Sequence, residues 1–133
     1  MEMKLVYKVW LENDDSRAFG EGPYQILRGV ESTGSLLGAA TLLSMAYSKA
    51  LHIIASCERS LGFALIHRKM GGISGGGSEV TLEAAKLMKV YEALRADTEN
   101  TLAKAYAKCF GGSVQVQFYT IVPHKPGRKN LLG

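Results

Sequence analysis

The sequence has 133 residues, of which 47% are hydrophobic and 21% are charged, with a net charge of +4 at neutral pH. This is the composition of a globular chain that can build one modest core. It has no apolar run near the roughly 20 residues that cross a bilayer and no secretory leader, so we expect a cytoplasmic protein with no membrane partner. The small positive excess favours an anionic partner such as nucleic acid.

The N-terminal segment alternates between apolar and polar residues from Lys4 to Glu12. This pattern predicts one half-buried strand. The turn-forming residues 13–16 follow, and Arg17–Gly20 is predicted to return as the partner strand of a β-hairpin. Trp10 interrupts the polar side of the first strand; packing against a helix or a second subunit is a simpler explanation than a partner contact.

A first helix is expected to follow this hairpin. Pro23 is suited to the first helical position, and the Thr33-Gly34 pair ends the helix. The helix carries an apolar stripe, which predicts a supporting, structural role: Tyr24, Ile26, Leu27 and Val30.

The segment from Ser35 to Leu61 predicts a helix-turn-helix. Ser35 can cap a short helix in which Ala39 and Ala40 allow close approach of a second helix. A break at residues 43–45 precedes a longer helix. At about 100° per residue, that helix has an inward face (Tyr47, Ala50, Ile54, Cys57, Leu61) and an outward face (Ser48, Lys49, His52, Ser56, Arg59). The outward face bears no acidic residue, although a polar outer face is often only a solvated one.

A second hairpin is predicted directly after this helix. Residues 64–70 and 79–82 form its strands, and the glycine-rich segment 71–77 forms its tip. Glycine lets a backbone lie close to a sugar-phosphate wall, and Arg68 and Lys69 at the base of the tip are placed to meet phosphates. Such a hairpin after a helix-turn-helix is the wing of a winged helix.

A long helix is expected from a Thr81 cap to about Cys109. It carries apolar residues at three- and four-residue spacing, which predicts a coiled-coil-like homodimer seam: Leu87, Tyr91, Leu94, Leu102 and Ala105, with Thr98 and Cys109 between or beyond them. The alternative is that this seam folds back onto its own domain. Gly111-Gly112 ends the helix, 114–122 predicts a strand that joins the N-terminal strands, and the basic tail is expected to be mobile.

The sequence predicts no catalytic site, metal site or cofactor. Cys57 and Cys109 lack a nearby partner and are expected to be buried, and the three histidines are scattered. The segment GGISGGG lacks the Lys-Ser/Thr of a P-loop and does not fit G-x-G-x-x-G. We therefore expect a protein that is not an enzyme.

Six stretches in this order resemble one family: KLVYKVWLE, FGEG, TGSLLGAA, SMAYSKAL, LGFAL and GGISGGGSEVTLEA. From Lys4 to about Phe110 the chain resembles the N-terminal DNA-binding domain of ModE-type regulators, which are LysR-like winged helices. The sequence departs from the family at Ser44, Ser48 and Leu51, where the family often has Gly, Lys or Arg, and Trp. We expect no molybdate-binding domains like those of full-length ModE proteins, so the resemblance implies a DNA-binding regulator and not molybdate sensing.

The predicted fold is mainly α (α+β), a winged helix-turn-helix with an N-terminal β-hairpin, a β-wing and a long C-terminal dimerisation helix. Residues 1–110 form the DNA-binding domain, with the dimerisation helix at about 82–109, and 111–133 form a strand and a basic flexible tail. The predicted function is a homodimeric regulator that binds double-stranded DNA in a sequence-specific way. Two alternatives stay open: a protein-interaction module on the same scaffold, and a stand-alone molybdate- or tungstate-responsive regulator. The sequence does not identify an operator or an effector. The residues predicted to contact DNA are Ser35, Tyr47, Ser48, Lys49, His52, Arg68, Lys69 and Gly72.

Overall fold

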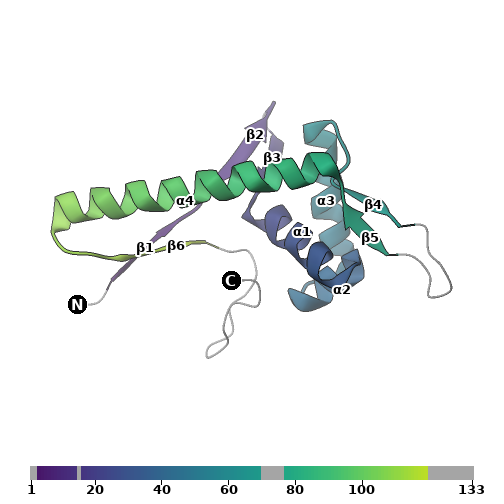
Figure 1. Cartoon of the computed structure of the whole chain (residues 1–133), viewed down its shortest axis with the longest axis horizontal. Helices are drawn as coiled ribbons and strands as arrows, with labels where there is room; N and C mark the ends of the chain where they lie inside the picture. The colour runs from purple at the N-terminus through teal and green to yellow at the C-terminus, as the bar shows by residue number, and fades with distance from the viewer. Residues whose placement is uncertain (1–2, 15, 70–76, 120–133) are drawn as a thin grey trace.

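The computed structural model describes residues 3–14, 16–69 and 77–119 (Figure 1). This part of the chain forms four helices and six short strands, which confirms the predicted α+β class. The helices are α1 (Glu21–Thr33), α2 (Leu36–Leu42), α3 (Tyr47–Leu61) and α4 (Leu82–Phe110). The strands are β1 (Lys4–Tyr7), β2 (Trp10–Asn13), β3 (Ser16–Gly20), β4 (Ile66–Arg68), β5 (Ser78–Val80) and β6 (Gln115–Phe118).

Helix α1 lies at the centre of the core. Its predicted apolar stripe is buried, and it ends at Gly34 in the left-handed conformation, as expected. The helix starts two residues earlier than Pro23 predicted, because Gly20 caps it directly after β3 and Pro23 becomes the third helical residue. On the face toward α2, a Cβ at Gly29 would lie only 2.7 Å from the Cβ of Ala39. Small residues therefore allow these two helices to touch.

Helices α2 and α3 form a steeply bent pair. The Ser35 hydroxyl caps α2 by accepting a hydrogen bond from the Gly38 amide at 2.8 Å, as predicted. The turn places Ser44 at a φ of 55°, a conformation that favours glycine, and the two helix axes differ by 116°. No helix of the described residues could span a membrane by itself; α2 and α3 reach the required length and apolarity only when joined across this bend.

The N-terminal segment differs from the prediction of one strand over Lys4–Glu12. It is divided at Lys8-Val9 into β1 and β2, which belong to different sheets. Strand β2 pairs with β3 in the predicted antiparallel hairpin, and β1 pairs in parallel with β6. The predicted addition of the C-terminal strand to the N-terminal strands is therefore confirmed within one chain, over residues 115–118. The remainder of the predicted strand and the tail, from residue 120 on, lie outside the described residues.

Trp10 lies in β2 and is 38% exposed. The indole Nε1 donates a hydrogen bond to Glu12 at 2.7 Å, and the Arg17 guanidinium stacks over the ring at 4.2 Å. Cationic side chains, instead of an apolar helix face, thus hold the ring.

Strands β4 and β5 form an antiparallel hairpin, shorter than the predicted strands 64–70 and 79–82. The Ser78 amide donates to the Gly34 carbonyl at 2.8 Å, which fastens the hairpin, where its strands meet the tip, to the corner between α1 and α2. A side chain at Gly77 would overlap that same carbonyl oxygen, so this position requires glycine. The hairpin is therefore anchored by its backbone to the corner between α1 and α2.

Helix α4 is attached to the core by a buried carboxylate. Glu21 is only 7% exposed, and it accepts hydrogen bonds from the Tyr91 hydroxyl at 2.7 Å and from Arg95 Nη1 at 3.0 and 3.2 Å. Burial, followed by the bond to Glu21, raises the pKa of Tyr91 well above its usual value. The Tyr91 ring also packs edge-on against Phe19, with centroids 5.4 Å apart. Beyond this point α4 extends away from the other helices, and β1 and β6 run alongside it (Figure 1).

The predicted dimer seam along α4 is divided between two environments. Tyr91 is 3% exposed within its own chain, and Leu87 packs against the same core, so neither offers a surface to a partner. Leu102 is half-buried, whereas Leu94 and Ala105 are exposed. The N-terminal part of the predicted seam, Leu87 and Tyr91, therefore folds back onto its own domain, which was the alternative to a dimer contact.

The two cysteines also differ. Cys57 is buried on α3 as predicted, and burial raises the pKa of its thiol to about 11. Cys109 is exposed near the end of α4, so the prediction that it is buried was wrong. The cause is that α4 has left the core long before this residue.

Replacing Glu21 with Ala should lower the free energy of unfolding by about 2–4 kcal/mol, because the change leaves the Tyr91 hydroxyl and the Arg95 guanidinium without their shared acceptor. Urea titration followed by circular dichroism measures this loss. Glu31→Ala on the same helix is the matched control, since Glu31 forms only an exposed 3.8 Å pair with Arg28 and should cost less than about 0.5 kcal/mol. Similar small losses in both variants would contradict the role given to Glu21.

Candidate nucleic-acid interface

The outer side of α3 presents hydrogen-bond donors to solvent. Ser48, Lys49, His52 and Arg59 are all exposed, while Ser56 is half-buried. The opposite side of α3 packs into the core through Ala50, Ile54 and Cys57, in agreement with the helical projection. The helix thus has one side fixed to the protein and one side available for a ligand.

Carboxylates are kept away from this surface. Glu58 is the sole acidic residue of α3, and its Oε2 accepts hydrogen bonds from the amides of Leu65 at 2.7 Å and Ile66 at 3.4 Å. This bond ties the end of α3 to the start of β4. On the hairpin, Glu79 lies 2.6 Å from His67 Nε2 across the two strands. The charges of Lys49, Arg68 and Lys69 thus have no acidic partner within salt-bridge distance in the described part of the chain.

The predicted phosphate-contacting residues lie around the base of the hairpin tip. Arg68 ends β4 and Lys69 follows it, both exposed, and the Lys69 amide bonds to the Gly77 carbonyl at 2.9 Å. Ser35 belongs to the corner that holds the hairpin, because it directly follows Gly34, the acceptor of the Ser78 amide. The Ser35 hydroxyl is engaged in capping α2 and is half-buried. Gly72 lies outside the described residues.

Tyr47 occupies a different position from the one predicted by the helical projection. It is the first residue of α3 and is 45% exposed, so it does not belong to the inward face. The start of the helix projects beyond the core at this point. Nearly half of the surface of Tyr47 is therefore accessible to solvent.

Leu51 was not among the predicted site residues, yet it lies on the same accessible surface. It is 45% exposed and lies next to the exposed Ser48 on the helix surface, three residues further on. The major groove of DNA admits an α-helix, and an exposed apolar side chain on such a helix is suited to contact with a thymine methyl group. Its departure from the helical amphipathic pattern was the signal that could have identified it.

Comparison with known proteins gives a distant relationship. The chain is 24% identical over 115 residues to the "Molybdenum transport protein ModE" of Azotobacter vinelandii, which covers 84% of this chain and 43% of that protein. It is 31% identical over 94 residues to the protein of the same name from Herbaspirillum seropedicae, covering 71% of this chain and 31% of that protein. No protein-family model matches the chain.

The chain thus spans less than half the length of either curated relative. Both matches agree with the resemblance seen in the sequence motifs. Together they support a ModE-like relationship for this chain.

Proposed function

We propose that this protein is a cytoplasmic transcriptional regulator that binds double-stranded DNA through a winged helix-turn-helix. The proposal rests mainly on the outer side of α3, where hydroxyl and cationic side chains are exposed and carboxylates are engaged elsewhere. The 116° bend between α2 and α3 lies within the range of helix-turn-helix pairs, and a hairpin follows α3 as a wing does. The similarity to two ModE proteins supports the same function.

In this proposal α3 is the recognition helix and enters the major groove. Lys49 bonds to the O6/N7 edge of guanine, and Leu51 lies against a thymine methyl. Ser48 and His52 make less selective contacts with the bases or the backbone. Residues 1–110 form the DNA-binding unit, and 111–133 form a C-terminal segment whose strand β6 pairs with β1.

The hairpin positions the protein on the duplex without reading its sequence. Arg68, Lys69 and the hydroxyl of Tyr47 contact phosphates, and Ser35 and Gly72 approach the backbone beside them. Because Gly34 anchors the base of the hairpin tip, the phosphate contacts keep a fixed register relative to α3.

Lys49→Ala should weaken binding to a duplex selected from a random library by about 1–3 kcal/mol, while binding to random DNA changes little, because a base contact is lost. Fluorescence anisotropy with both duplexes measures the difference. Lys104→Ala, a change of equal charge at an exposed position on α4, is the control and should leave both affinities unchanged.

Arg68→Ala should instead weaken binding to both duplexes equally, because a phosphate contact is lost. The slope of log K against log salt concentration should become shallower by about 1. Absence of any salt-dependent binding by the wild-type protein at low salt would contradict the proposal and favour a protein-interaction module.

We also propose that the protein acts as a homodimer, since two recognition helices would then contact half-sites about one DNA turn apart. The part of α4 that remains available for a partner carries Val90, which is 67% exposed, together with Leu94 and Ala105. These three residues lie within about 60° of one another around the helix at 100° per residue. Tyr91 and Leu87 are left out because they pack within their own chain.

Leu94→Arg should convert a dimer into a monomer, because a charged side chain would be placed in an apolar helix-helix contact. Light scattering coupled to size exclusion measures the mass, against 14.4 kDa for one chain. Ala96→Arg, exposed on a different side of α4, should leave the dimer intact. A wild-type protein of monomer mass, alone and on DNA, would rule out this part of the proposal.

A further inference from the structure

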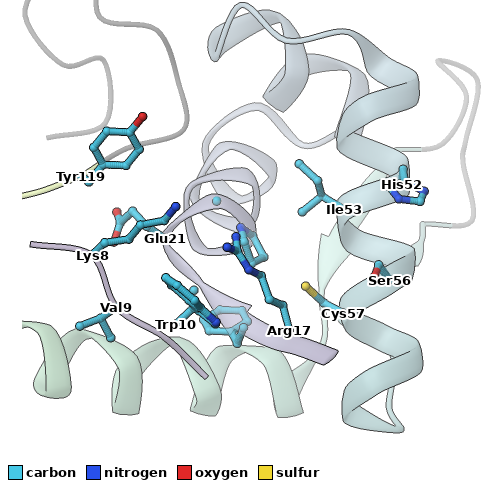
Figure 2. A pocket seen from close by; sticks show the side chains of 14 residues that line it. Lys8, Val9, Trp10, Arg17, Glu21, His52, Ile53, Ser56, Cys57 and Tyr119 are labelled. Atoms are coloured by element: carbon cyan, nitrogen blue, oxygen red, sulfur yellow. The ribbon is translucent and has the colours of Figure 1, made fainter. Parts of the chain in front are cut away.

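A cavity of about 210 Å³ lies between the N-terminal hairpin and α3 (Figure 2). Ile53 and Cys57 project into it from α3, and Arg17 and Trp10 project from the hairpin. Lys8 and Tyr119 close the side formed by the β1–β6 strands, and the start of α1 at Gly20–Gly22 lies between these walls. Three segments that are distant in the sequence thus meet around one space.

The cavity is maintained by contacts outside it. At the tip of the hairpin, Asn13 Nδ2 donates to the Ser60 carbonyl at 2.7 Å, and the hydroxyls of Ser16 and Ser60 lie 3.0 Å apart. At the other end the Tyr119 amide donates to the Tyr7 carbonyl at 2.7 Å. The first two contacts tie the hairpin tip to the end of α3, and the third ties Tyr119 to the end of β1, so the segments around the cavity are fixed to their neighbours at both ends.

The charges facing this space are predominantly positive. Lys8 Nζ lies 5.2 Å from the Trp10 ring and 5.3 Å from the Tyr119 ring, and Arg17 stacks on Trp10 at 4.2 Å. The one lining carboxylate, Glu21, is already bonded to Arg95, Tyr91 and Gln25. Glu12 bonds to the indole nitrogen but does not line the cavity. Two cations therefore face an aromatic and aliphatic wall without an anion of their own inside the cavity.

We infer that this cavity binds a small planar anion that joins one aromatic ring to a carboxylate. A dry apolar cavity of about 150 Å³ is enough for benzene, so the volume here accommodates a single ring with its acidic group. The ring lies against Trp10, Phe19 and Ile53, and the carboxylate lies between Lys8 and Arg17, whose guanidinium can bond to it through two N–H groups.

Occupancy of this site also affects α3. His52 and Ser56 belong both to the rim of the cavity and to the outer side of α3, and His52 extends away from the cavity in Figure 2. A ligand packed against Ile53 and Cys57 thus acts on the same helix that contacts DNA, and by linkage DNA changes the affinity for the ligand by the same factor. This coupling, unlike the site itself, rests on the proposed function.

The test uses benzoate as the probe and the full chain as it exists. Trp10 is the single tryptophan of the protein, so its fluorescence reports on this wall alone. We expect a saturable change with a Kd of about 1 mM or tighter, matched by a saturable heat in calorimetry. Arg17→Gln and Lys8→Gln should each raise the calorimetric Kd about tenfold, whereas Lys104→Gln should not.

Benzyl alcohol keeps the ring and removes the charge, and it should bind about tenfold more weakly than benzoate. Circular dichroism of each variant establishes that it is folded. No saturation by about 10 mM benzoate, equal binding of benzyl alcohol, or unchanged binding by both cavity variants would each overturn the site. If the site binds benzoate but the DNA affinity does not respond to it, only the coupling to α3 fails.

Discussion

The arrangement of this protein depends on one buried carboxylate. Glu21 stands at the first turn of α1, where its charge is favourable to the helix dipole, and it bonds to Tyr91 and Arg95 of α4. A carboxylate so far removed from water is tolerated only because both partners remain in place. The contact therefore fixes the direction in which α4 leaves the core. That direction in turn decides which residues of α4 are available to a second subunit.

The same core supports the two surfaces on which function is proposed. Helix α3 is packed against α1 and α2 on one side, and the Glu58 carboxylate joins its end to β4. The hairpin is held to Gly34 by its backbone, so the cationic residues at the base of its tip keep a constant relation to the outer side of α3. The N-terminal hairpin covers the remaining side of α3 and leaves the cavity there. One helix thus separates a surface suited to a duplex from a cavity suited to a small anion.

Local signals allowed much of the fold to be predicted. The caps at Ser35 and Thr81, the stop at Gly34 and the apolar stripes gave the helices, and the alternation at 114–118 gave the last strand. Such local signals do not predict contacts between residues that are far apart in the sequence. Glu21 and Arg95 are 74 residues apart, and nothing near Arg95 marks it as a partner. The same is true of Tyr91, whose three- and four-residue spacing suits a dimer seam and a core face equally. The cavity could not be predicted, because it needs the placement of the β2–β3 hairpin beside α3, and no local pattern marks Asn13 and Ser60 as partners.

The central claim is that the outer side of α3 and the base of the hairpin tip lie against a duplex. Mapping of backbone amide shifts by ¹H–¹⁵N NMR, during titration with a selected DNA duplex, tests it most directly. The account predicts that the largest changes fall on residues 47–52 and on Arg68 and Lys69, with small changes along the distal half of α4. Changes concentrated on α4 or on β1 and β6, with α3 unaffected, would contradict it.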